Sequence, residues 1–208
     1  MSLTVVKLGG STLADAALFG WIEALCQSRM PLVIVPGGGP FAHQVRNAQP
    51  SVSFSDAAAH AMAILAMEQF GVLLCDLNKR FIAARTREDM VEAAARGHIP
   101  VWLPSVMTRG RGDIPQSWDV TSDSLAAWLA GQLQANALLL IKQTRDIRVD
   151  DDALSLSRRG IVDPCFPSML PSGLALYVAG RDDLADAAEM MLRERLPGTR
   201  ISQAEVVA

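Results

Sequence analysis

The chain has few of the residues that mark secreted, metal-binding or membrane proteins. Its three cysteines, Cys26, Cys75 and Cys165, are odd in number, far apart and without a metal-type pairing. We therefore expect reduced, mostly buried thiols in a cytoplasmic protein that holds no metal through its own side chains. We also expect no apolar run of membrane-spanning length, and an N-terminus that enters a strand directly rather than a signal peptide.

The chain also lacks a large excess of charge of either sign. The net charge is −3, and the basic residues are scattered along the chain, which argues against a nucleic-acid-binding surface. Half of the residues are hydrophobic and a fifth are charged, as in folded globular proteins. At 208 residues the chain is long enough for one substantial core, and we expect a single domain over 1–208.

Two glycine loops, each at the end of a short β-branched strand, are the most informative feature present. The first run is Val-Val-Lys-Leu-Gly-Gly-Ser over 5–11, and the second is Leu-Val-Ile-Val-Pro-Gly-Gly-Gly-Pro over 32–40. Glycines allow backbone N–H groups to approach an anion closely, and a helix that starts just after such a loop adds its dipole. With Lys7 in the same region, the two loops predict a site that holds one or two phosphates.

Strands alternate with helical stretches, which predicts a mainly parallel sheet covered on both faces. Besides the strands that lead into the two loops, the patterns predict strands at 100–103, 137–141, 174–179 and 199–201. They predict helices at 14–26, 56–78, 122–133 and 182–195, another helix start at Thr86, and an exposed loop over 150–160. The nearly all-round apolar helix 56–78 predicts a homo-oligomer, because such a helix is buried in the core or against a second subunit.

Ligands of open parallel sheets collect at the carboxyl ends of the strands. Lys7, both glycine loops and Lys142 lie at such ends, and Asp123 lies at a helix start expected on the same side. Phosphoryl transfer depends on positioning and on neutralising negative charge, for which two lysines and glycine amides are suited. Asp123 would hold the two lysines in place, although an acid in a first helical turn also serves simply to complement the helix dipole.

The order of these motifs resembles the amino acid kinase superfamily, in which the first strand ends in K-x-G-G-S and the second in a G-G-G loop. Residues 119–126 are similar to the acidic loop of that superfamily, and 139–144 to a later strand and lysine of its uridylate-kinase-like members. The resemblance implies an α/β three-layer sandwich with a mainly parallel central sheet. It also implies use of ATP, with Mg²⁺ held mainly through phosphates. An acceptor-side lobe would cover about 1–135 and a reduced nucleotide-side lobe about 136–208.

Within that superfamily, the segments 56–71 and 118–124 are similar to the aminomethylfuran phosphate kinases of methanofuran biosynthesis. This resemblance implies transfer of phosphate from ATP to a small phosphomonoester, which becomes a diphosphate. Lys7, Asp123 and Lys142 would be catalytic. The residues implied to bind substrate or phosphate are Gly9, Gly10, Ser11, Gly37, Gly38, Gly39, His60, Asp119, Thr121 and Asp163. Those implied to bind nucleotide are Lys7, Gly9, Lys142 and Thr144.

Three of these assignments have structural alternatives. His60 lies on an otherwise apolar helix face, where a hydrogen-bonded core histidine is frequent. Asp119 is either a substrate contact or a turn residue. Asp163 would pair with a substrate ammonium, with Phe166 covering a small ring, or would be a solvated acid in a proline-bounded turn.

Two departures keep other functions open. The T-D-V-D-G-[VI] stretch of the relatives reads Thr-Arg-Asp-Ile-Arg-Val-Asp here, over 144–150, and the later G-G-M-x-x-K helix is missing. A non-catalytic protein that binds a phosphorylated metabolite would have this pattern.

The second loop also satisfies the dinucleotide fingerprint G-x-G-x-x-A over 37–42. Pro40 inside that turn, and a Lys7 loop left unexplained, count against a dehydrogenase.

Overall fold

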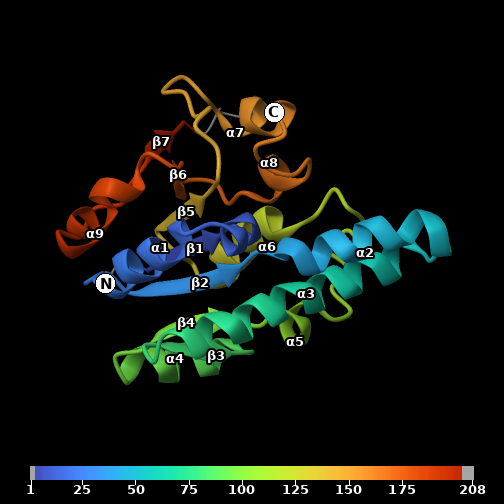
Figure 1. The fold of residues 1–208 in the computed structure, drawn as a ribbon, viewed down its shortest axis with the longest axis horizontal. Helices are drawn as coiled ribbons and strands as arrows, with labels where there is room; N and C mark the ends of the chain where they lie inside the picture. The colour runs from blue at the N-terminus through green and yellow to red at the C-terminus, as the bar shows by residue number, and fades with distance from the viewer. Residues whose placement is uncertain (1–2, 203–208) are drawn as a thin grey trace.

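The computed structural model describes residues 3–202, which build one seven-stranded sheet with the strand order β3-β4-β2-β1-β5-β6-β7 (Figure 1). All neighbouring strands are parallel except β7, which pairs antiparallel with β6 at the edge. The strands are β1 Thr4–Leu8, β2 Leu32–Pro36, β3 Phe81–Ala84, β4 Ile99–Trp102, β5 Ala137–Ile141, β6 Ala175–Ala179 and β7 Thr199–Ile201. The predicted mainly parallel α/β sheet is confirmed, as is the edge position of 199–201.

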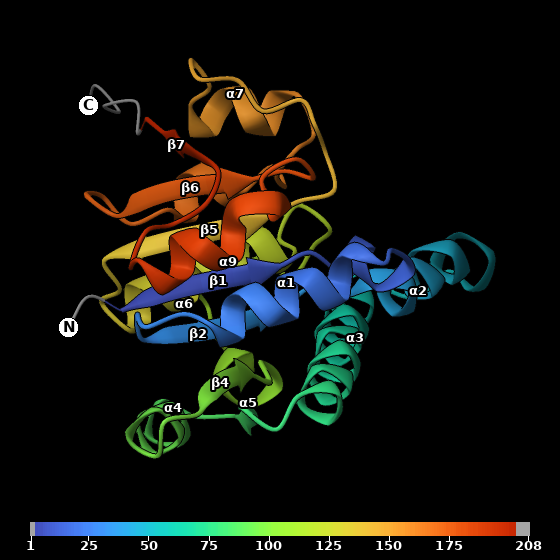
Figure 2. The same ribbon diagram turned by 60° about the vertical axis from the view of Figure 1, so that its left-hand side comes forward.

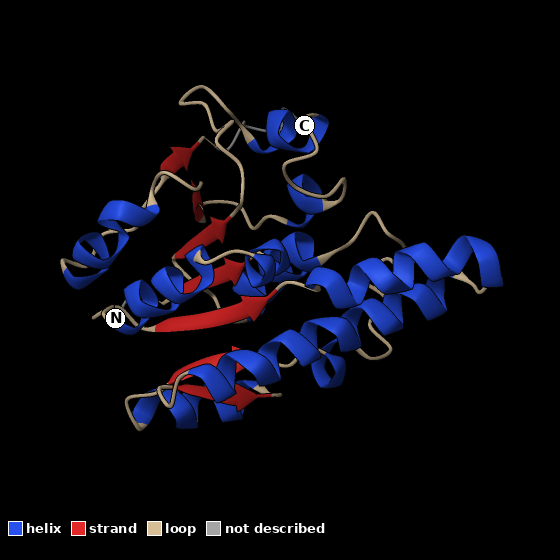
Figure 3. Ribbon diagram, viewed as in Figure 1, coloured by secondary structure: helices blue, strands red, loops and turns tan. Residues whose placement is uncertain are grey.

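Helices cover both faces of this sheet and make it the central layer of a sandwich (Figures 2 and 3). Neighbouring strand residues point to opposite faces. Val6 packs with α1 and α9 in one apolar cluster, while Val5 packs with α6 in another. The helical elements are η1 Gly10–Ala14 (3-10), α1 Ala17–Cys26, α2 Gly39–Val52, α3 Asp56–Leu77, α4 Arg87–Ala95, α5 Ser105–Thr108, α6 Ser122–Gln132, α7 Ala153–Arg158, α8 Phe166–Met169 and α9 Leu184–Leu192.

The helices α2 and α3 form a hairpin that extends beyond the carboxyl ends of the strands (Figure 1). Ser55 caps α3, its hydroxyl accepting a hydrogen bond from the amide of Ala58 at 3.2 Å. We expected no apolar run of membrane-spanning length, but α3 has that length and composition. A core helix passes the same test, and 44% of its most apolar window is buried inside the protein. Leu65 and Val72 remain exposed on it.

Two local predictions were wrong. A continuous helix over 14–26 is interrupted because Asp15 has an extended backbone, so that η1 and α1 are separate elements. Part of the expected loop 150–160 is the helix α7, which begins with a capping box between Asp152 and Ser155. Within the same segment, Asp151 is buried and pairs with Arg159 at 2.5 Å.

Candidate functional site

The two glycine loops lie side by side because β1 and β2 are paired, with Leu8 opposite Pro36. Two of the predicted phosphate-binding amides are already used within the sheet. Gly9 donates its N–H to the carbonyl of Ile141 at 3.1 Å, and Gly37 donates to that of Leu8 at 2.9 Å. Four residues of the loops instead line a cavity: Gly10, Ser11, Gly38 and Gly39.

Asp123 holds both predicted lysines, one with each carboxylate oxygen. The Lys142 ammonium donates a hydrogen bond to Oδ2 at 2.5 Å, and the Lys7 ammonium lies 3.0 Å from Oδ1. The Lys7 contact is an ion pair without the alignment of a hydrogen bond, since Oδ1 has no hydrogen-bond partner in the described structure. All three side chains are at least 86% buried.

Burial also affects the protonation of Asp123 and Lys142, which together with Lys7 are called the triad below. Burial lowers the pKa of Lys142 to about 8, although the charge of Asp123 opposes the shift. Burial alone would raise the pKa of Asp123, but the charges of Lys142 and Lys7 overcome it and the pKa is lowered. The Asp123 carboxylate is therefore ionised at neutral pH and compensates one of the two lysine charges.

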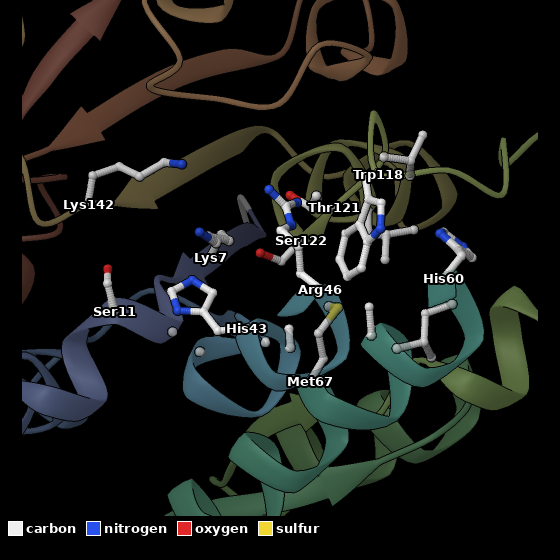
Figure 4. A pocket seen from close by; sticks show the side chains of 18 residues that line it. Lys7, Ser11, His43, Arg46, His60, Met67, Trp118, Thr121, Ser122 and Lys142 are labelled. Atoms are coloured by element: carbon white, nitrogen blue, oxygen red, sulfur yellow. The ribbon is translucent and has the colours of Figure 1, made fainter. Parts of the chain in front are cut away.

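The cavity measures about 250 Å³ and opens between the loops, α2, α3 and the start of α6 (Figure 4). Lys7, Ser11 and His43 lie at one end of it, and Trp118 and His60 lie at the other. Apolar side chains from α2, α3 and α6 complete the wall: Ala42, Ala63, Ile64, Met67 and Leu125. Such a cavity can hold an anion at the lysine end and a small carbon skeleton at the other.

His60 lines this cavity, and it also borders a second cavity of about 230 Å³ between α3 and the segment 105–116. Its side chain is 93% buried, and burial lowers its pKa, while a hydrogen bond with the backbone of Ser117 opposes the shift. Its position is therefore compatible with both interpretations from the sequence, a hydrogen-bonded core histidine and a residue beside the substrate.

Asp163 lies elsewhere, because its carboxylate caps the N-terminus of α6. It accepts hydrogen bonds from the amide and hydroxyl of Thr121 at 2.9 and 2.8 Å, and from the amide and hydroxyl of Ser124. Burial, followed by the charge of Asp123, raises the pKa of Asp163. Phe166 is fully buried in the core. Asp163 thus caps a helix and Phe166 fills the core, and neither lines the cavity. Asp163 is also not the solvated acid of the alternative interpretation, because it is only 8% exposed.

Three other residues that the sequence predicted to bind substrate or nucleotide lie in loops before α6 or after β5. Thr121 lines the cavity, and its hydroxyl is used by Asp163. Asp119 is exposed in the turn before α6 and does not line the cavity. Thr144 follows β5, where its hydroxyl accepts a hydrogen bond from the amide of Asp146 at 3.0 Å, also outside the cavity.

The sequence analysis missed Arg46 and Trp118, both of which line the cavity. The Arg46 guanidinium lies over the indole of Trp118, 4.3 Å from the ring centroid. The available signal was the second glycine loop itself, because a helix that starts after it places His43 and Arg46, three residues apart, on one face. Within residues 3–202, no group of three or more His, Cys, Asp or Glu side chains is arranged to hold a metal ion.

Known proteins share this architecture. Over 97% of the chain, the fold matches uridylate kinase from Archaeoglobus fulgidus, with a TM-score of 0.65, 17% identity and all of that chain covered. UMP kinase from Bacillus anthracis matches with a TM-score of 0.69 and 16% identity, over 97% of this chain and 96% of that one. At these identities the likeness concerns the fold alone.

Sequence comparison is more specific. The chain is 29% identical over 142 residues to the [5-(aminomethyl)furan-3-yl]methyl phosphate kinase of Methanocaldococcus jannaschii, a match that spans 65% of this chain and 63% of the relative. A family model described as the amino acid kinase family matches residues 2–155, which include the two glycine loops, Asp123 and Lys142. The chain therefore belongs to the amino acid kinase family.

Proposed function

We propose that the protein is an ATP-dependent kinase that phosphorylates a small phosphomonoester and so produces a diphosphate. The observation that carries the proposal is the buried Lys7–Asp123–Lys142 triad, which lies beside the two glycine loops at one end of a cavity. A site that must bring two phosphate groups together needs concentrated positive charge in a partly dry environment. The two lysines supply that charge, and Asp123 keeps their ammonium groups in place.

In this reaction an oxygen of the acceptor phosphate forms a bond to the γ-phosphorus of ATP. The bond from that phosphorus to the β,γ-bridging oxygen breaks, and ADP leaves. The acceptor phosphate is already ionised, so no general base is required. Lys7 would contact oxygens of both donor and acceptor, and Lys142 would neutralise charge on the departing β-phosphate. The loop amides of Gly10 and Gly39 would donate hydrogen bonds to phosphate oxygens.

The most specific candidate acceptor is [5-(aminomethyl)furan-3-yl]methyl phosphate, on a route to a methanofuran-type one-carbon carrier. The similarity to the kinase of that name supports this choice. The cavity, at about 250 Å³, lies just below the usual range of small-molecule sites and so favours a small acceptor over a large one.

The residues present fit the phosphates of ATP better than its base. Lys7, Lys142 and the amides of Gly10 and Ser11 provide for the phosphates, and ATP supplies the transferable phosphoryl group. Mg²⁺ would be held mainly through the phosphates. We place the nucleotide beyond the end of β5, near Thr144, with about 136–208 as the nucleotide-side lobe and about 1–135 as the acceptor-side lobe. We also propose a cytoplasmic homo-oligomer.

A second candidate function is a non-catalytic protein that binds a phosphorylated metabolite. The observation in its favour concerns the segment 144–160, where Arg159 forms ion pairs with Asp151 and Asp146 of the same segment. Against it, a binding protein has no evident need for the complete lysine–aspartate–lysine triad.

Phosphorus NMR of the protein with Mg-ATP and synthetic [5-(aminomethyl)furan-3-yl]methyl phosphate tests the proposal. We expect a new diphosphate signal with matching ADP release, and neither in a Lys7→Ala variant. ATP at 100 times its dissociation constant should also stabilise the protein by about 2.7 kcal/mol, which a melting curve detects. Stabilisation without product in the presence of several phosphomonoesters favours the binding protein.

A further inference from the structure

Arg46 is a charged side chain at the cavity that no carboxylate neutralises in the described structure. It is exposed on α2, has no ion pair among residues 3–202, and lies with its guanidinium over the indole of Trp118. Stacking on an aromatic ring uses the face of a guanidinium and leaves its N–H donors free in the plane. Arg46 is therefore oriented, but its donors have no hydrogen-bond or ion-pair partner among residues 3–202.

The indole that orients Arg46 is itself fixed by the same helix. The Trp118 Nε1–H donates a hydrogen bond to Gln49 Oε1 at 2.6 Å, and Gln49 follows Arg46 by one turn of α2. The amide group of Gln49 donates in turn to Asp56 Oδ1 at 2.8 Å, at the start of α3. Two successive turns of α2 thus hold Trp118, one by stacking of Arg46 and one by the hydrogen bond to Gln49; Figure 4 shows Arg46 beside Trp118.

The charge of the cavity wall restricts what Arg46 can bind. The wall carries the basic side chains of Lys7, Arg46 and Lys142, and none of the 18 lining residues is an aspartate or glutamate. Asp123, behind the wall, compensates one of the lysines. The excess positive charge suits a dianionic group such as a phosphomonoester.

The wall offers no carboxylate for a substrate ammonium. Asp163, which we expected in that role, is occupied by four hydrogen bonds from Thr121 and Ser124. Asp119 is exposed outside the cavity. An amine on the acceptor therefore has no ion-pair partner on the wall that the described residues form.

We infer that Arg46, oriented by Trp118, binds the phosphate of the acceptor, and that the site selects a compact phosphomonoester by this contact and not by an amine. The inference rests on the proposed kinase function and defines how that site chooses its acceptor. Arg46 is then a binding residue, and Trp118 is a positioning residue that acts through it.

The first test separates binding of the acceptor from turnover. We expect Arg46→Gln to raise the KM for the acceptor by about 10- to 100-fold, the usual loss for a hydrogen bond to a charged group. The kcat and the KM for ATP should change little, because the contact exists equally before and during the reaction. Arg46→Lys should recover part of the loss through its charge, and Trp118→Leu should raise the same KM to a smaller extent.

Arg29→Gln is the matched control, since Arg29 is exposed just before β2, at the opposite end of the strands, and we expect its kinetics to equal those of the wild type. An unchanged acceptor KM in Arg46→Gln would overturn the inference. So would an equal rise of the acceptor KM in Arg46→Gln and in Arg29→Gln.

The second test compares acceptors that differ in one group. (5-Methylfuran-3-yl)methyl phosphate carries a methyl group in place of the aminomethyl group, and we expect its kcat/KM to remain within about fivefold, below the loss that a charged contact would cause. A loss of about tenfold or more would show that the amine is recognised, and would overturn that part of the inference.

Calorimetric titration of the same two phosphates distinguishes failure of this inference from failure of the proposed function. If the wild type binds them but transfers no phosphate from Mg-ATP, the kinase proposal fails. The inference is then tested by whether Arg46→Gln weakens binding of the two phosphates. If the wild type binds neither compound, the inference is overturned as well.

Discussion

Gly10 and Gly39 approach each other so closely that neither position accommodates a side chain. A β-carbon on Gly10 would overlap the amide nitrogen of Gly39, and one on Gly39 would lie 2.8 Å from the carbonyl oxygen of Gly10. Gly39 also has a φ of +53°, in the left-handed region that favours glycine. The two loops are therefore packed backbone against backbone beside the cavity that Gly10 and Gly39 line.

This packing predicts a severe effect of Gly10→Ala. The new β-carbon meets backbone that cannot rotate away, so one loop must move. We expect a cost of about 1–3 kcal/mol, as for overpacked sites, or a fall in Tm of roughly 2–12 °C. Phosphate transfer should fall strongly because the loop amides are displaced. Gly112→Ala is the matched control, since its β-carbon would meet nothing within 4 Å. Equal melting curves and activities for the two variants would contradict the prediction.

The position of the triad was predictable from the sequence because it follows from the rules of parallel sheets. Lys7 lies near the end of β1, Lys142 follows the adjacent strand β5, and Asp123 lies in the first turn of the helix that leads into β5. All three therefore meet at the carboxyl ends of these strands. Periodicity and capping residues likewise predicted the ends of α3 and α6 to within one residue.

The end of the cavity formed by α2 and Trp118 was not predictable in this way. The helix α2 contains Pro50 and buries only Val45, so it lacks the apolar stripe that marks a helix in a sequence. Trp118 and Gln49 are 69 positions apart, and their contact depends on how the α2–α3 hairpin meets a loop without regular structure. Asp163 reads as a loop acid in the sequence, and only the tertiary structure brings it to the N-terminus of α6.

The triad predicts that Asp123→Asn impairs turnover more than substrate affinity. Without the carboxylate, two buried ammonium groups repel each other and leave the positions in which they serve the transition state. We expect kcat to fall on the order of 100-fold, with smaller changes in both KM values. Breaking a buried ion pair also costs about 3–5 kcal/mol, so melting curves must show that the variant is folded under assay conditions. Asp76→Asn, at an exposed position on α3, is the control. Full turnover in Asp123→Asn would refute the assignment.

The apolar face of α3 leads to a prediction about assembly. Met62, Leu65 and Val72 are 43%, 51% and 58% exposed and lie along one side of the helix. If this side is the contact between subunits of a homo-oligomer, Val72→Asp should give a smaller particle in size-exclusion chromatography with light scattering. Val149→Asp is the control, because Val149 is 89% exposed in a loop. A wild-type protein that is a monomer at micromolar concentration would contradict the predicted oligomer.

The low pKa of Lys142 predicts an alkaline limit to activity. Burial lowers this pKa to about 8, and only the charged form of Lys142 neutralises the departing phosphate. We therefore expect kcat/KM, which reports the free enzyme, to fall about tenfold per pH unit above pH 8. The limit on kcat should lie at higher pH, because bound phosphates favour the ammonium form. Lys142→Arg should remove the limit in whatever activity it retains, since a guanidinium stays charged.

The same shift affects stability with the opposite sign to that of an ordinary ion pair. The pKa of Lys142 is about 8 in the folded protein and 10.5 for an unperturbed lysine, as in the unfolded chain. Between pH 8 and 10.5 the unfolded chain therefore binds more protons than the folded protein does. The contribution of Lys142 to the free energy of unfolding therefore rises as the pH increases from 8 to 10.5. Deprotonation of Lys142 should thus lower activity above pH 8 while its contribution to the free energy of unfolding still rises. Melting curves of wild type and Lys142→Met at pH 8 and 10 measure the difference, and a contribution of Lys142 that falls over this range would contradict the assigned protonation.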